Sequence, residues 1–178
     1  SINGNYISFT RGNNDNLHYS KIYDIRNIAQ ADHGLVKTIN DGTLRRLFTI
    51  DDTRAIACYG TTWNDIDVVK VHNISDWAEL YSYNPDGSPK EADFSDGYFI
   101  TSANANLNNT INILKTTGSY GLVGISHNSA WHGATTHSHN FGNGSVVSDK
   151  YVAFRSQESD NSGRIHVHNV ADGSYVRS

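Results

Sequence analysis

Imidazole side chains gather in one polar stretch of the chain. Four of the nine histidines fall between residues 126 and 140: His127, His132, His137 and His139. His137 and His139 are two residues apart, so on a strand both rings would face the same side and could bind one metal ion. His127 or His132 would complete the ligand set, and neutral imidazoles suit zinc, copper or iron. The alternative is a polar surface loop with solvated histidines.

A second His-x-His pair, His166 and His168, falls inside a predicted strand. Lys70 and His72 occupy the matching positions of another repeat, which favours a structural role over metal binding. The single cysteine, Cys58, also falls in the middle of a predicted strand, where a buried and unreactive thiol is expected.

Catalytic motifs are not found in the sequence. It contains no Gly-x-Ser-x-Gly, no phosphate-binding loop and no His-Glu-x-x-His. Its fifteen Asp could supply the carboxylate pair of a glycosidase, but almost all fall in turn sequences, where Asp caps the backbone. Residues 13–16 and 160–163 offer oxygens for calcium, although hairpin turns use the same residues. We therefore expect a chain that is not an enzyme and holds no required cofactor.

Trp63 and Trp131 fall in polar stretches and are the candidate binding residues. An exposed tryptophan stacks on sugars or anchors a protein interface. The alternative is that each ring packs between neighbouring sheets.

The elements that position these residues are short strands in a repeated order. Matching positions, Tyr6, Ala55, Tyr98 and Tyr151, recur about every 40–50 residues. The second unit contains four predicted strands, over residues 43–50, 54–60, 67–74 and 78–84. Four strands at this period predict an all-β fold, a β-propeller of four-stranded antiparallel blades. The expected single domain covers 1–178, with blades at about 1–39, 40–87, 88–126 and 127–178.

Details of the repeat lead to three further expectations. Val69 and Val71 should share one strand face, with Lys70 and His72 on the other. Polar residues in one column, Asp24, Asn73 and Asn169, should accept backbone N–H bonds and hold the next turn. Residues 76–79 could begin a single helical turn. Only residues 1–4 precede the first repeat, so its leading strand should be missing, which suggests part of a larger propeller or longer chain.

Residues 163–176 (GRIHVHNVADGSYV) resemble the end of a WD40 or kelch propeller repeat. Residues 148–163 are similar to FG-GAP-like repeats of phage tail and other virion proteins. The chain departs from WD40 in lacking the Gly-His and Trp-Asp dipeptides, and from FG-GAP in lacking an Asp-x-Asp-x-Asp-Gly loop. The His-x-His pattern also resembles the iron sites of phage spike tips. These resemblances imply a propeller fold and an extracellular or virion location.

Charge limits the partners. A net charge of −4 and a pI near 6.1 argue against nucleic acid, and no apolar run is long enough to span a bilayer, so no membrane partner is expected. The leading hypothesis is a non-enzymatic structural segment of a phage tail or fibre-like assembly that contacts other protein subunits or glycans. A carbohydrate-active propeller enzyme or lectin is the second hypothesis, and an intracellular WD40-type scaffold is the third.

Overall fold

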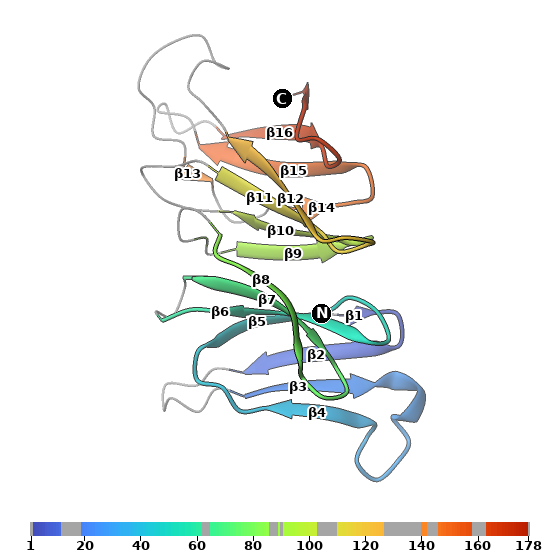
Figure 1. Cartoon of the computed structure of the whole chain (residues 1–178). Helices are drawn as coiled ribbons and strands as arrows, with labels where there is room; N and C mark the ends of the chain where they lie inside the picture. Colours follow the sequence, from blue (N-terminus) through green and yellow to red (C-terminus); the bar gives the residue numbers. More distant parts are fainter. Residues whose placement is uncertain are drawn as a thin grey trace. The chain divides into compact units, whose positions relative to one another are not determined.

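The computed structural model describes residues 2–11, 19–61, 65–85, 89, 91–102, 110–126, 140–141, 146–157 and 163–177. The chain divides into two compact units, Ser1–Asn84 and Pro85–Ser178. Each unit contains two antiparallel sheets whose strands follow one another in chain order (Figure 1). Within the described ranges the single helical segment is a 3-10 turn, η1 (Ile25–Asn27), and no helix is long and apolar enough to cross a membrane.

The first unit holds two four-stranded sheets. The first sheet comprises β1 (Ile2–Asn3), β2 (Tyr6–Arg11), β3 (Tyr19–Asp24) and β4 (Leu35–Ile39). The second sheet comprises β5 (Leu44–Thr49), β6 (Arg54–Tyr59), β7 (Val68–Asn73) and β8 (Glu79–Tyr83). These four bounds confirm the strands predicted for the second repeat.

The second unit repeats the arrangement. The third sheet comprises β9 (Glu91–Ser95), β10 (Tyr98–Ser102), β11 (Thr110–Lys115) and β12 (Gly121–Ser126). The fourth sheet comprises β13 (Asn140–Phe141), β14 (Val146–Val147), β15 (Tyr151–Gln157), β16 (Gly163–Asn169) and β17 (Tyr175–Arg177), with β13 and β14 both paired to β15. The all-β prediction is confirmed.

Aspartate side chains hold many of the turns between strands. The Oδ1 of Asp41 accepts from the backbone N–H of Thr43 at 2.8 Å, and the Oδ1 of Asp51 accepts from the N–H of Thr53 at 2.8 Å. The Oδ1 of Asp172 does the same for Ser174 at 2.9 Å. An Asp that satisfies the backbone two residues later stabilises the turn, which explains why the chain is rich in Asp.

Strand register fixes which residues are equivalent in the four sheets. The two central strands of each sheet begin their pairing with one matched pair: Tyr6↔Asp24, Arg54↔Asn73, Tyr98↔Lys115 and Tyr151↔Asn169. The sequence match of Ala55 with Tyr6 is therefore wrong by one residue, and a one-residue slip moves a side chain to the other face. We call the face of each sheet that bears this matched pair its front face, and the opposite face its rear face.

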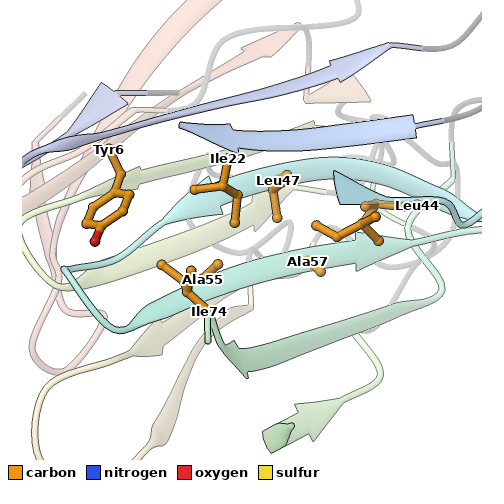
Figure 2. Close-up of a cluster of buried hydrophobic side chains, with 8 residues drawn as sticks. Tyr6, Ile22, Leu44, Leu47, Ala55, Ala57 and Ile74 are labelled. Atoms are coloured by element: carbon orange, nitrogen blue, oxygen red, sulfur yellow. The ribbon is translucent and has the colours of Figure 1, made fainter. Parts of the chain in front are cut away.

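Within each unit, the front face of one sheet packs against the next sheet. In the first unit the shared cluster joins the two sheets through Tyr6, Ile22 and Ile39 on one side and Leu44, Leu47, Ala55, Ala57 and Ile74 on the other (Figure 2). In the second unit Ile100, Ile111 and Ile113 of the third sheet meet Val147, Val152, Phe154 and Val170. The hydroxyl of Ser8 adds a 2.8 Å hydrogen bond to the carbonyl of Leu47 across the first junction.

Two local predictions need correction. A leading strand of the first repeat is present as β1, whose two residues are followed by a turn at Gly4 and Asn5 into β2. Residues 76–79 form no helical turn. Trp77 instead adopts a left-handed φ of 64°, at the place where the corresponding turns have His33 (φ 54°) and Gly173 (φ 73°). A bulky residue rarely adopts this conformation, so its ring must be held by packing.

Candidate binding surfaces

The sequence-predicted binding and metal residues lie outside the described residues. This applies to Trp63, Trp131, His127, His132, His137 and His139, and to the calcium candidates at 13–16 and 160–162. Their roles therefore stay predictions. Within the described ranges, no group of three or more His, Cys, Asp or Glu side chains could hold a metal ion.

The second His-x-His pair is part of the core. His166 and His168 are buried, and both rings stack on Phe154 at centroid distances of 5.4 and 5.3 Å. The Nδ1 of His168 donates to the carbonyl oxygen of Gly173 at 2.9 Å, which ties β16 to the turn before β17. These contacts agree with the structural role expected from the sequence.

His72 makes the same bond in the second sheet. Its Nδ1 donates to the carbonyl oxygen of Trp77 at 3.0 Å, so its Nε2 is the acceptor for the hydroxyl of Tyr59 at 3.2 Å. The Trp77 ring stacks on the His72 ring at 4.4 Å, and this contact holds the left-handed turn. Burial lowers the pKa of both His72 and His168. Each ring therefore holds the turn that follows its strand through its Nδ1 bond.

Asp24, Asn73 and Asn169, the polar residues that precede equivalent turns, behave partly as predicted. The carboxylate of Asp24 accepts from the N–H of Arg26 at 3.0 Å, and the amide oxygen of Asn73 accepts from the N–H of Ser75 at 3.1 Å. Asn169 differs, because its side-chain nitrogen donates to the Ser174 hydroxyl at 2.7 Å. Two of the three side chains therefore hold their turn by accepting a backbone N–H bond.

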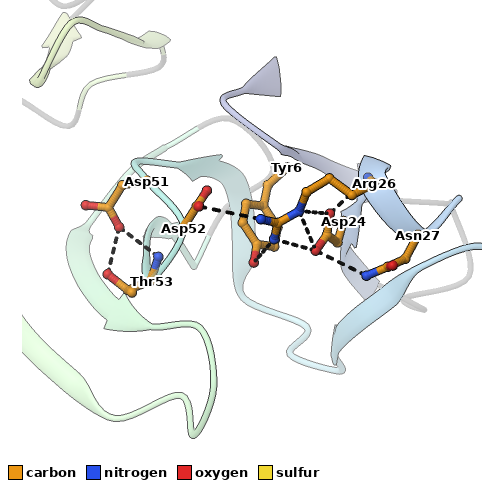
Figure 3. A network of polar contacts seen from close by, with 7 residues as sticks. All are labelled: Tyr6, Asp24, Arg26, Asn27, Asp51, Asp52 and Thr53. Atoms are coloured by element: carbon orange, nitrogen blue, oxygen red, sulfur yellow. Dashed lines mark hydrogen bonds and ion pairs between the residues drawn. The ribbon is translucent and has the colours of Figure 1, made fainter.

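Arg26 is the centre of a polar network at one end of the first unit (Figure 3). Its guanidinium lies 2.6 Å from the carboxylate of Asp24 and 3.9 Å from that of Asp52, and it lies over the Tyr6 ring at 5.8 Å. The hydrogen bond from Arg26 lowers the pKa of Asp24. Asp52 belongs to the turn between β5 and β6, so the network fastens the two sheets at this end.

The Cys58 side chain is buried, as predicted. Burial raises the pKa of its thiol, which leaves no thiolate to act as a nucleophile.

The rear face of the first sheet is an open apolar groove of about 550 Å³. Its lining residues are mostly aromatic or aliphatic: Ile7, Phe9, Thr10, Tyr19, Lys21, Tyr23, Ile28 and His33. The rings of Phe9 and Tyr23 meet edge to face at 6.0 Å, and the ammonium of Lys21 lies 5.6 Å from the Tyr19 ring centre. The aromatic side chains are therefore held in place by one another in a surface that is already formed.

The front face of the fourth sheet is also open. It exposes Tyr151, Ile165 and Val176, and a smaller hollow of about 310 Å³ lies between Tyr151, Val167, Val176 and Arg177. Sequence reasoning missed both open faces. A signal for these faces was present in the sequence, because Phe9 and Ile165 are apolar residues in predicted strands of the first and last repeats.

No protein-family model and no curated protein matches the chain. Solved structures do match. Hsv2 of Kluyveromyces lactis aligns over 97% of this chain and 46% of its own, at 18% identity and a TM-score of 0.59. The Cps50 (Swd1) β-propeller domain of Myceliophteria thermophila aligns over 98% of this chain and 55% of its own, at 8% identity and a TM-score of 0.56.

The chain spans about half the length of these structures. Identities this low show a shared fold and leave activity and partners open. Four successive four-stranded antiparallel sheets, together with these matches, show that the chain has the fold of an incomplete β-propeller.

Proposed function

We propose that this chain is a non-enzymatic propeller segment that binds other protein through its open sheet faces. The observation that carries the proposal is the groove on the rear face of the first sheet. Phe9 and Ile28 are more than half exposed there, beside the partly buried Tyr19 and Tyr23. Contiguous exposed apolar surface of this kind marks interaction sites, and aromatic side chains dominate the energetics of protein interfaces.

Enzymatic function has less support in the described part of the chain. The two buried histidines that hold turns, His72 and His168, are occupied with backbone carbonyls. The Cys58 thiol is buried. The extracellular or virion location rests on the sequence resemblance alone, and the same binding surface would serve an intracellular scaffold.

Selection from a random peptide library, with the full chain immobilised, tests the proposal. We expect peptides that bind the wild-type chain and lose affinity about tenfold or more on Phe9→Asp, because a charge would enter the centre of the apolar contact. Leu80→Asp is the matched control, since Leu80 is also exposed (47%) but lies on β8. It should leave peptide affinity unchanged.

A second assay addresses the carbohydrate alternatives. The wild-type chain is incubated with a panel of polysaccharides and applied to a glycan array. Protein binding at the groove predicts no release of sugar and no glycan signal that Phe9→Asp removes. Sugar release by the wild-type chain, or a library that yields no peptide sensitive to Phe9→Asp, would contradict the proposed function.

A further inference from the structure

Ile165 occupies a position that is buried in the other sheets. Its register equivalents on the front faces are Ser20, Val69 and Ile111, each four residues before the matched polar or basic residue of its central strand. These three are at most 1% exposed, whereas Ile165 is 64% exposed. The fourth sheet therefore presents, uncovered, a side chain that the repeat normally packs away.

Phe9 is the corresponding exception on the rear faces. Its register equivalents are Ala57, Thr101 and Phe154, each three residues after the first residue of the matched pair. They are at most 1% exposed, whereas Phe9 is 58% exposed. Phe9 and Phe154 share residue type as well as position, which makes the third-to-fourth-sheet junction a close template for what should cover Phe9.

That template pairs a front face with a rear face. In the second unit Ile111, on a front face, and Phe154, on a rear face, belong to one buried cluster. In the first unit Ile22 on a front face shares a cluster with Ala57 on a rear face. Among the described residues, the rear face of the first sheet is open at Phe9 and the front face of the fourth sheet is open at Ile165. These are the two halves of one more junction of the same kind.

We propose that a second copy of this chain supplies the missing half, so that the rear face around Phe9 packs on the front face around Ile165 of another molecule. This deepens the proposed function, on which it rests, by naming the protein partner. Both faces offer apolar surface: the rear face has an apolar groove, and Ile165 is the most exposed of the large apolar side chains described. Such a head-to-tail contact uses different surfaces on the two copies, so repeated contacts can form either a closed ring or an open chain of copies.

Sedimentation velocity of the full chain and two variants tests this contact. The wild-type chain should sediment as two or more copies, with a mass that rises with concentration. Phe9→Asp and Ile165→Asp should each sediment as one copy, because a buried carboxylate without a partner raises the dissociation constant by on the order of a hundredfold or more. A mixture of the two variants should regain a two-copy species. The Ile165→Asp variant keeps its Phe9 face, and the Phe9→Asp variant keeps its Ile165 face. These two intact faces can still form one junction.

Leu80→Asp is again the control and should associate like the wild-type chain. Circular dichroism of each variant checks that its sheets are formed. A wild-type chain that stays a single copy at every concentration would overturn the inference. So would association that only one of the two aspartate variants abolishes, or a mixture that stays monomeric. If the chain is monomeric yet its selected peptides still require Phe9, the proposed function stands and only the second copy is refuted.

Discussion

Thr101→Val should make the protein more stable. Thr101 lies on β10 and is fully buried, and its hydroxyl has no hydrogen-bond partner among the described residues. Valine has the same branched shape but replaces the hydroxyl with a methyl group. The variant therefore removes a buried polar group without opening a cavity.

The magnitude follows from the cost of the buried hydroxyl. Mutational data place the penalty for such a group at about 1–3 kcal/mol. We expect Thr101→Val to raise the free energy of unfolding by about 1 kcal/mol and Tm by about 2–4 °C.

Thr116→Val, at the residue that directly follows β11, is the matched control. Thr116 is also fully buried, but its Oγ1 donates to the carbonyl oxygen of Gly97 at 2.9 Å. The same chemical change there removes a hydrogen bond, and we expect it to lower the free energy of unfolding by about 0.5–1.5 kcal/mol.

Urea unfolding followed by circular dichroism measures both variants. The comparison is valid when the free energy of unfolding of each variant falls with urea concentration as steeply as that of the wild-type chain, because the unfolded states are then comparable. Equal destabilisation by the two variants would refute the reasoning. It would mean that the Thr101 hydroxyl makes a hydrogen bond, as the Thr116 hydroxyl does.

Three further predictions concern the core, acid and the turns. Phe154→Ala should lower the free energy of unfolding by about 3–5 kcal/mol in urea titrations, because it removes a large ring from a buried hydrophobic cluster and from its stacking contacts with His166 and His168. Acid should destabilise the wild-type chain below pH 6.5, the ordinary pKa of histidine: burial lowers the pKa of His72 and His168, so the unfolded chain binds protons first. The double variant His72→Gln and His168→Gln should show a flatter pH dependence of the free energy of unfolding between pH 5 and 7. Gly34→Ala should cost clearly more stability in thermal melts than Gly118→Ala: both residues have left-handed φ, but only at Gly34 would the new Cβ meet a backbone oxygen, that of Asp24, at 2.3 Å.

The sequence predicted the strands because their pattern is local. Alternation around Val69 and Val71 and the turn chemistry of Asp and Gly are visible in any one repeat. The equivalence of Tyr6 and Ala55 failed because register is set by pairing between strands, here Arg54↔Asn73, and a single sequence does not show pairing.

The turn at Trp77 escaped prediction for a different reason. Its left-handed backbone depends on a stacking contact with His72 and a bond to the same ring, which are tertiary contacts. Propensity alone assigns a large aromatic residue elsewhere, and an Asp three residues before a Glu reads as a helix start. Tertiary packing overrode the local signal.

The candidate site also shows this difference between what is local in the sequence and what depends on tertiary packing. The histidines and tryptophans chosen from the sequence were chosen for their chemistry, and they lie outside the described residues. The open faces at Phe9 and Ile165 consist of ordinary apolar strand residues. They become distinctive only when register shows that their equivalents, such as Phe154 and Ile111, are buried.

The most direct test of the front-to-rear contact is chemical cross-linking between two differently marked copies. Phe9→Cys chains are mixed with Ile165→Cys chains and treated with a short bismaleimide, and the native Cys58 is buried and should contribute little background. Our account predicts a cross-linked product that contains one chain of each variant, and little product from either variant alone. Products that form equally well with a single variant, or no cross-linked product in the mixture, would contradict it.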